Sequence, residues 1–237
     1  MCGRTALTAS PDDLRDAFGL DELPRIDAHY NVPPSRPVGV VRIALGSTRR
    51  TLEALRWGLV PTWAKDAKIG HKLALARAET VATTGAFRDA FRLRRCLVAV
   101  DGFYEWHRDP GQARKAAGSP FFVRRPDGRS FALAGLWSRW VSPDGEVIES
   151  CAIVTQAARP PLEAIHDRMP LVLPPDVWDR WLDPALTDPA ALTPLLIPRT
   201  PDLPLVAYAV SSRVNDPRND DPSCLEPAGE PVQRSLF

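Results

Sequence analysis

Four short apolar runs dominate the middle of this chain of 237 residues. They lie at Cys96–Val100, Phe121–Val123, Phe131–Trp137 and Ala152–Val154. Continuous apolar runs of this length are typical of buried strands. Asp-Gly pairs at 127–128 and 144–145 supply turns between them, and a further strand is predicted from Val38 to Leu45. A sheet is therefore expected at the centre of the fold.

Helices are predicted on either side of these strands. Residues 11–18 form the first, because Ser10 can cap its N-terminus and Pro11 suits its first position. Other helical segments are expected at Phe87–Leu93, near 175–182 and near 188–196. The pattern predicts an α+β fold in one domain, with a curved, mostly antiparallel or mixed, barrel-like sheet and flanking helices.

Two regions are expected to lack regular structure. A proline-rich loop is predicted through Asn31–Pro34, and residues 216–232 are expected to be loose because they are rich in Pro, Asp, Asn and Gly. We assign residues 1–227 to the folded domain and residues 228–237 to a disordered tail.

Composition narrows the class of protein. Hydrophobic residues make up 44% and charged residues 25%, as in ordinary globular domains. No apolar run is long enough to span a membrane, and no signal peptide is recognisable. We therefore expect a cytoplasmic, nucleoid-associated monomer without membrane contact. The 4 cysteines and 4 histidines are scattered, so neither a disulfide scaffold nor a metal site or cofactor is expected.

Basic residues are numerous but balanced, since the net charge is only +1. Of the 30 basic residues, 26 are arginine and 4 are lysine. This bias has two explanations: a GC-rich genome that favours arginine codons, or recognition of phosphate by the planar arginine fork. Composition alone does not decide between them.

Cys2 gives the chain unusual chemical potential. Cysteine is small enough for removal of Met1, which leaves an α-amine and a thiol on one residue. The amine can condense with an aldehyde to an imine, and the thiol can then close a five-membered thiazolidine. Ring closure is intramolecular and therefore has a high effective molarity. The alternative is an incidental terminal cysteine, so the case depends on the rest of the chain.

Several separate motifs follow Cys2 in order. They are Met1–Arg4, Tyr30–Pro34, Trp57–Trp63, Ala76–Thr80, Asp101–Trp106, Ile165–Leu171 and Val210–Ser211 with Asn215. In this combination the chain resembles the SOS-response-associated peptidase (SRAP) family of abasic-site processing proteins. The resemblance runs from residue 2 to about residue 227, and it implies the family's curved mixed sheet with flanking helices.

The resemblance also implies an activity. Family members crosslink covalently to abasic sites in single-stranded DNA through the N-terminal cysteine, and the thiazolidine shields the lesion from strand cleavage. Single-stranded DNA with abasic sites is thus the expected partner. By the same resemblance, Glu105 matches the catalytic glutamate and His166 the histidine that assists sugar-ring opening and reversal of the crosslink.

The residues themselves suit these roles. Glu105 lies among the aromatic residues Phe103, Tyr104 and Trp106, and an apolar setting favours a carboxyl that shuttles protons near neutral pH. His166 has a side chain whose ordinary pKa allows acid or base catalysis. The alternatives are a carboxylate paired with an arginine and a structural histidine.

Further residues match DNA-binding positions of the family. Arg4 and Arg77 are the expected phosphate clamps, and Trp63 with Pro33 and Pro34 offers flat apolar surfaces for unpaired bases. Polar contacts are expected from Asn31, Thr155 and Ser211. Taken singly, each of these residues has a surface or packing role as the commoner alternative.

Two positions depart from the family. Leu75 replaces an asparagine that contacts the lesion sugar, and loss of one such polar contact costs about 1–3 kcal/mol. Gly85 stands where some relatives have an arginine on a phosphate. These departures predict slower capture and a shallower salt dependence of DNA binding.

The last residues resemble a short peptide that docks into the bacterial sliding clamp. Gln233 would bind the rim of an apolar pocket that Leu236 and Phe237 fill. The alternative is a tail whose two apolar residues have no partner.

Three functions remain open from the sequence. The first is the DNA-lesion crosslinker, with a lyase-like side reaction when the imine undergoes β-elimination. The second is a cysteine-type peptidase or autopeptidase that acts between Met1 and Cys2. The third is a non-catalytic binder of single-stranded DNA.

Overall fold

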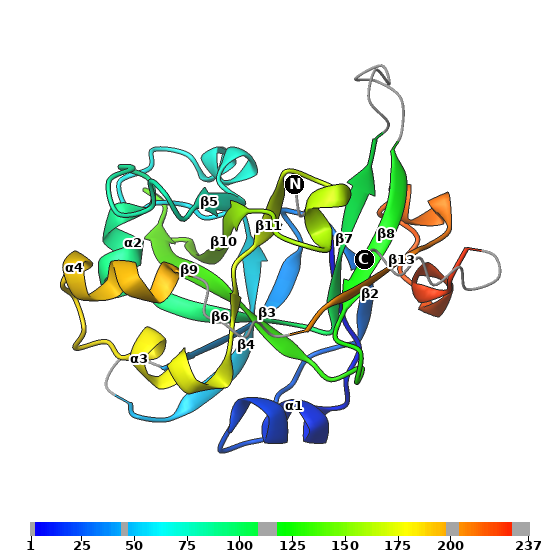
Figure 1. Cartoon of the computed structure of the whole chain (residues 1–237). Coiled ribbons are helices and arrows are strands. Elements are labelled where there is room, and N and C mark those ends of the chain that lie inside the picture. Colours follow the sequence, from blue (N-terminus) through cyan, green and yellow to red (C-terminus); the bar gives the residue numbers. More distant parts are fainter. Residues whose placement is uncertain (1–2, 44–46, 109–117, 198–203, 229–237) are drawn as a thin grey trace.

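A closed barrel of five strands forms the centre of the computed structural model, which describes residues 3–43, 47–108, 118–197 and 204–228 (Figure 1). Around the barrel the strands are β10 (Val147–Ala157), β4 (Arg50–Trp57), β3 (Pro37–Ile43), β6 (Arg95–Val100) and β9 (Phe131–Val141). The ring closes because β10 pairs with β4 in parallel and with β9 in antiparallel orientation. The predicted α+β class and barrel-like mixed sheet are confirmed.

Alternate residues of the barrel strands fill its interior. Val40 pairs with Val98, which pairs in turn with Leu133, and all three are fully buried. Gly135 makes room for Cys96, since a Cβ there would lie 2.8 Å from the sulfur. Burial raises the pKa of the thiols of Cys96 and Cys151. Both therefore stay protonated and are poor nucleophiles.

Arg42 is a buried cation on the barrel strand β3. Its guanidinium lies 4.3 Å from the ring centroid of Trp137 and binds Glu149 at 2.6 and 3.1 Å and Glu53 at 2.5 Å. The buried guanidinium is therefore stabilised by two carboxylates and by stacking on an aromatic ring.

A second sheet packs beside the barrel and contains five strands. In order they are β13 (Val206–Ala209), β8 (Ser119–Arg124), β7 (Gly102–His107), β1 (Thr5–Leu7) and β2 (His29–Val32). The chain passes from β6 into β7 at Asp101. Its carboxylate accepts hydrogen bonds from the backbone and hydroxyl of Thr8, from Ala9 N and from the Ser130 hydroxyl, at 2.5–3.0 Å.

Three short strands complete the first sheet: β5 (Leu75–Arg77), β11 (Arg168–Pro170) and β12 (Val172–Leu173). Short helices pack around both sheets, and η5 and η6 lie against strands of the second one. The α-helices are α1 (Pro11–Phe18), α2 (Arg88–Leu93), α3 (Trp178–Leu182) and α4 (Pro189–Leu192), and the 3-10 helices are η1 (Ala67–Lys72), η2 (Leu162–Ala164), η3 (Pro175–Val177), η4 (Thr193–Leu196), η5 (Ser212–Asn215) and η6 (Pro222–Leu225).

The predicted helices are confirmed where the sequence carries clear signals. Ser10 accepts a hydrogen bond from Asp13 N at 3.2 Å, and Gly19 ends α1 with a φ of +61°. The helical stretches predicted near 175–182 and 188–196 each divide into a 3-10 turn and an α-helical turn. Within the described residues, no helix is long and apolar enough to cross a membrane.

Two predictions of irregular structure are wrong in part. Asn31 and Val32 belong to β2, because Val32 pairs with Thr5 of β1. The segment after 216 is ordered as far as residue 228: Asp220 accepts hydrogen bonds from Tyr30 N at 2.6 Å and Asn31 N at 3.0 Å. Residues 229–237, most of the predicted tail, lie outside the described residues, as does the end of the strand predicted to reach Leu45.

Candidate functional site

The N-terminal strand enters the structure beside β7. Cys2, the predicted nucleophile, lies outside the described residues, which begin at Gly3. Tyr104 N donates a hydrogen bond to Arg4 O at 2.9 Å, and Thr5 pairs with Phe103. Arg4 and Thr5 therefore run antiparallel to β7, and Arg4 lies opposite Tyr104, the neighbour of Glu105.

Glu105 is buried on β7, with only 1% of its surface exposed. Side chains two residues apart on a strand share a face, so Glu105 lies on the side of Phe103. Phe121 is its partner on β8. Phe103 and Phe121 pack in one apolar cluster with Ile165. Of the aromatic neighbours predicted for this carboxyl, Phe103 shares its face, whereas Tyr104 and Trp106 lie on the opposite face of β7 and pack in a separate cluster.

His166 follows η2 and has a quarter of its side chain exposed. Its Nδ1 lies 3.0 Å from Arg168 N and 2.7 Å from a carboxylate oxygen of Asp167. The first contact needs an unprotonated Nδ1 and the second a protonated one. Burial lowers the pKa of His166, and the charge of Arg108 lowers this pKa further. We therefore favour the neutral ring, with Nδ1 accepting from Arg168 N and the proton on Nε2, because exposed Asp167 is screened by water.

Glu105 and His166 belong to the same end of the molecule. Arg108, whose charge acts on His166, follows the end of β7 and is three residues after Glu105. Ile165, next to His166, packs in the apolar cluster that contains Phe103. Figure 1 shows β11 and the preceding η2 segment beside the upper part of β7. The two predicted acid–base residues are thus on neighbouring elements.

Thr155 and Arg77 meet on adjacent strands at this end. Arg77 of β5 pairs with Thr155 of β10, and Thr155 pairs on its other side with Pro170 of β11. Arg77 is exposed, whereas Thr155 is buried and its hydroxyl donates to Ala76 O at 3.2 Å. The exposed Arg77 side chain is therefore accessible to a phosphate group. The Thr155 hydroxyl instead stabilises the pairing of β10 with β5.

Arg168 joins these strands and carries a role that sequence reasoning did not assign. Its guanidinium donates two hydrogen bonds to Glu79, at 2.6 and 3.0 Å, and two to the carbonyl and hydroxyl of Thr155, at 2.8 and 3.1 Å. The signal was its place in the motif around His166. Arg168 thus connects the histidine loop to β10 and to the segment after β5.

Asn31 and Arg4, both predicted to contact DNA, bind each other. Arg4 Nη1 donates to Asn31 Oδ1 and to Val214 O, both at 2.7 Å. The Asn31 amide donates to Val214 O, Asp216 O and Asn219 O at 2.8–3.2 Å. Asn31 is 1% exposed, so in this structure it offers no surface to a DNA strand. We call Arg4, Asn31 and these three carbonyls the N-terminal anchor.

Trp106 adds to this anchor, whereas the sequence analysis placed it among the aromatic residues around Glu105. Its indole donates to the side-chain oxygen of Asn215 at 2.7 Å, and the Arg4 guanidinium lies 5.7 Å from its ring centroid. Ser211 caps the adjacent η5 by accepting from Arg213 N at 3.3 Å. The polar contact predicted for Ser211 is therefore engaged within the protein.

The remaining predicted DNA contacts are accessible. Trp63 is 57% exposed, and its indole lies 3.4 Å from Gly85 O. Pro33 and Pro34 are half-buried. Leu75 of β5 is half-buried and packs against the apolar cluster that includes Ile165 and Met169. In the described part of the chain, no three His, Cys, Asp or Glu side chains are grouped to hold a metal ion.

Comparison with known proteins decides the family. The family model described as SOS response associated peptidase (SRAP) matches residues 1–217. The chain belongs to the SRAP family. It is 41% identical to the abasic site processing protein YoqW of Bacillus subtilis, over 95% of this chain and 99% of that protein. It is 30% identical to the abasic site processing protein HMCES of Xenopus tropicalis, over 95% of this chain and 78% of that protein.

Solved structures support the SRAP fold. A protein from Bacteroides thetaiotaomicron superposes with a TM-score of 0.81 over 96% of this chain and all of that one, at 23% identity. A protein from Bordetella bronchiseptica gives a TM-score of 0.72 at 26% identity, over 89% of this chain and 100% of that one.

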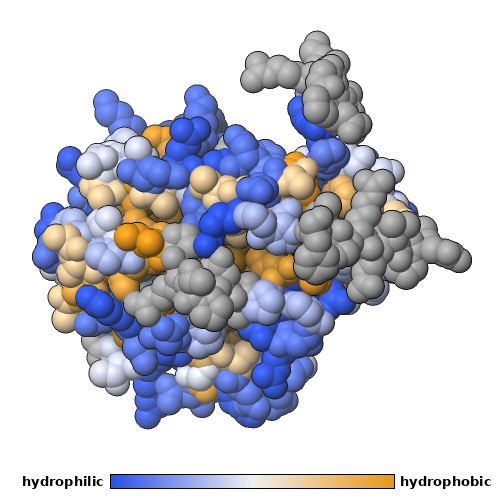
Figure 2. All heavy atoms as spheres, viewed as in Figure 1, coloured by the Kyte–Doolittle hydropathy of each residue, from blue (hydrophilic) through white to orange (hydrophobic). Residues whose placement is uncertain are grey.

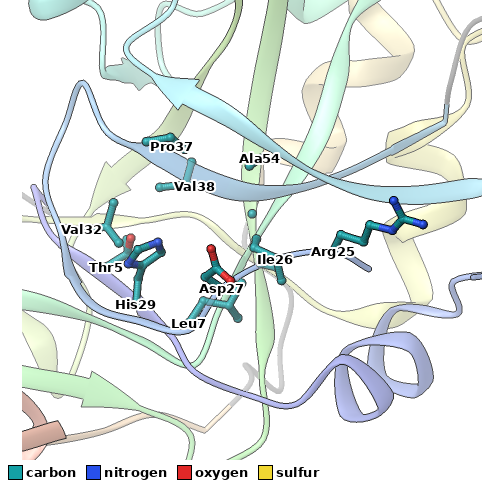
Figure 3. A pocket seen from close by; sticks show the side chains of 12 residues that line it. Thr5, Leu7, Arg25, Ile26, Asp27, His29, Val32, Pro37, Val38 and Ala54 are labelled. Atoms are coloured by element: carbon teal, nitrogen blue, oxygen red, sulfur yellow. The ribbon is translucent and has the colours of Figure 1, made fainter. Parts of the chain in front are cut away.

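A cavity of about 190 Å³ in this SRAP chain lies away from these residues. It is bounded by β1, β2, β3 and the segment before β2, and Figure 3 shows Asp27 and Val38 approaching it from opposite sides. Neither Glu105 nor His166 lines it. The cavity is therefore separate from the two predicted acid–base residues.

Proposed function

We propose that this SRAP protein captures the aldehyde of an abasic site in single-stranded DNA through Cys2 and holds it as a thiazolidine crosslink. The names of the relatives YoqW and HMCES, abasic site processing proteins, support the lesion. The placement of Arg4 beside Tyr104, next to buried Glu105, supports the reaction centre. This placement is the observation that carries the proposal.

Chain geometry limits where the nucleophile can be. Cys2 is two residues before Arg4, and two extended residues span about 7 Å. Arg4 O is held by Tyr104 N. The proposal therefore requires the amine and thiol of Cys2 to act beside the β7 strand that carries Glu105.

The reaction can be written with all atoms balanced. The α-amine adds to the aldehyde carbon, and the resulting carbinolamine loses its oxygen as water to give an imine. The thiol then adds across the C=N bond, with sulfur on carbon and the proton on nitrogen. Glu105 moves the protons of the dehydration step, and neutral His166 assists opening of the sugar ring. No cofactor is needed.

An intact-mass measurement tests this proposal. The protein is mixed with an oligonucleotide that carries one abasic site, and the product is denatured. We expect a covalent species whose mass equals protein plus DNA minus one water, with Met1 absent. Binding without a covalent product would support the non-catalytic binder, and cleavage of peptides other than at Met1 would support the peptidase.

Leu75→Asn is expected to accelerate capture by about 5- to 150-fold, because one polar contact to the lesion sugar contributes about 1–3 kcal/mol. The rate of adduct formation at saturating DNA measures this. Leu75→Met is the matched control, since it keeps an apolar side chain of similar volume in the cluster with Ile165. Equal rates for the two variants would show that position 75 does not face the lesion.

The C-terminal residues suggest a partner that recruits the protein to replication sites. We propose that Gln233, Leu236 and Phe237, which lie outside the described residues, bind the sliding clamp. A fluorescently labelled peptide of residues 225–237 is expected to bind purified clamp at micromolar concentration, and a peptide with Leu236 and Phe237 changed to alanine is not. Equal anisotropy of the two peptides would remove this partner.

A further inference from the structure

Lysines gather on one short segment of this arginine-rich chain. Only 4 of the 30 basic residues are lysine, and Lys65, Lys68 and Lys72 lie on or just before η1. All three are exposed, as is Arg36. Arg36 belongs to the turn next to η1, because the Ser35 hydroxyl and His71 Nδ1 are 2.8 Å apart. We call Arg36, Lys65, Lys68 and Lys72 the basic platform.

The 3-10 helix η1, which carries part of the platform, packs closely against the segment that follows β4. Gly58 and Gly70 pack backbone against backbone: a Cβ on Gly58 would lie 2.7 Å from Gly70 O, and a Cβ on Gly70 would lie 2.6 Å from Gly58 O. Leu59 N donates to Leu73 O at 3.1 Å. Because no side chain separates the two segments, η1 is fixed to the end of β4.

The charge of the platform is largely unneutralised. Lys68 approaches Asp66 at 3.9 Å, but these side chains are 85% and 60% exposed, so this pair contributes little. Lys65, Lys72 and Arg36 form no ion pair within residues 3–43, 47–108, 118–197 and 204–228. A local surplus of positive charge therefore stands on a chain whose net charge is only +1.

The platform is continuous with the candidate site. Leu75, the first residue of β5, is three residues after Lys72, and the exposed indole of Trp63 precedes Lys65 by two. Figure 1 shows η1 at the end of the barrel that carries β5 and β11. In the same view, Figure 2 shows mainly hydrophilic side chains along this end of the molecule.

We propose that the basic platform binds the phosphates of the DNA strand that flanks the lesion. Lysine ammonium groups on a fixed backbone can follow a flexible phosphate chain without sequence preference. The platform thus extends the DNA-binding surface beyond the lesion. This inference rests on the proposed function only because both assume that single-stranded DNA is bound. The platform would also supply positive charge that this chain lacks at Gly85, where some relatives have an arginine.

The test is the salt dependence of binding to undamaged single-stranded DNA of two lengths, 6 and about 20 nucleotides. Single-strand binding sites cover about 4–16 nucleotides, so the shorter strand is near the lower limit and the longer strand exceeds the upper one. The variant is Lys65→Gln, Lys68→Gln, Lys72→Gln combined. With the long strand we expect the slope of log K against log salt to fall by about 2, since each lysine contact contributes about 0.7 on single strands. With the 6-nucleotide strand we expect little change.

A matched variant removes equal charge elsewhere: Arg25→Gln, Arg129→Gln, Arg180→Gln, all exposed and remote from η1. It is expected to keep the wild-type slope. Wild-type slopes in the lysine variant, or an equal loss in the arginine variant, would overturn the platform. Adduct formation on a saturating short abasic strand separates the two proposals. It should be unchanged in the lysine variant, and its absence from the wild type counts against the proposed function only.

Discussion

Cys2→Ala is expected to form no heat-stable adduct with an abasic strand and to cleave that strand instead. The α-amine of residue 2 remains, so the imine can still form. Without the thiol there is no ring closure, although closure in the wild type profits from an effective molarity of about 10⁵ M or more. The imine acidifies the neighbouring C–H bond, and β-elimination becomes its main exit. Cys2→Ser is expected to behave similarly.

Denaturing gels with a 5′-labelled abasic strand measure both products in one lane. Borohydride reduction should trap the imine of Cys2→Ala as a covalent species, which serves as the control for intact amine chemistry. A stable adduct without borohydride would falsify the role of the thiol. A variant with neither adduct nor cleavage would show that the amine is not the first nucleophile.

Asn31→Leu is expected to lower both stability and the rate of capture. The substitution leaves the carbonyls of Asp216 and Asn219 without the Asn31 amide and removes an acceptor from Arg4. Loss of several buried hydrogen bonds costs about 3–5 kcal/mol, which lowers the melting temperature by about 6–20 °C in a domain of this size. Thermal unfolding followed by circular dichroism measures the first effect.

Kinetics separates two roles for Asn31. If the N-terminal anchor positions Cys2, the rate constant at saturating DNA should fall by at least tenfold while the Kd for undamaged DNA is unchanged. Asn31→Asp keeps the acceptor for Arg4 and should recover part of that rate. A weaker Kd with an unchanged rate constant would instead support the direct DNA contact that the sequence predicts. Measurements well below the melting temperature of each variant exclude partial unfolding.

The barrel strands could be predicted because their burial is visible in single runs. Cys96–Val100 is apolar at every position, since β6 has packed residues on both faces. The helix at 11–18 carries its own cap. In contrast, β1, β5 and β11 have three residues each, too few for a period to emerge. They are strands only because β7 and β10 offer them pairing partners far away in sequence.

The roles of the site residues stay predictions, but the sequence motifs indicated which residues to place. Glu105 and His166 stand in motifs, and the structure places them at one end of the molecule. The internal hydrogen bonds of Asn31 could not be predicted, because its partners are backbone carbonyls 183–188 residues later. A carbonyl carries no sequence signal, so no pattern of residue types could reveal the anchor. The attachment of η1 to the end of β4 could not be predicted either, because it depends on close backbone packing of Gly58 and Gly70.

The N-terminal anchor also bears on how the protein is made. Arg4 is bound by the carbonyls of Val214 and Asn215, 210 and 211 residues away. Arg4 is translated among the first residues, but the segment that carries Val214 and Asn215 is among the last. Contacts of such wide separation also form late in folding. Arg4 therefore gains these two contacts only when synthesis is nearly finished, so the start of β1 cannot be fixed by them while the chain is still on the ribosome.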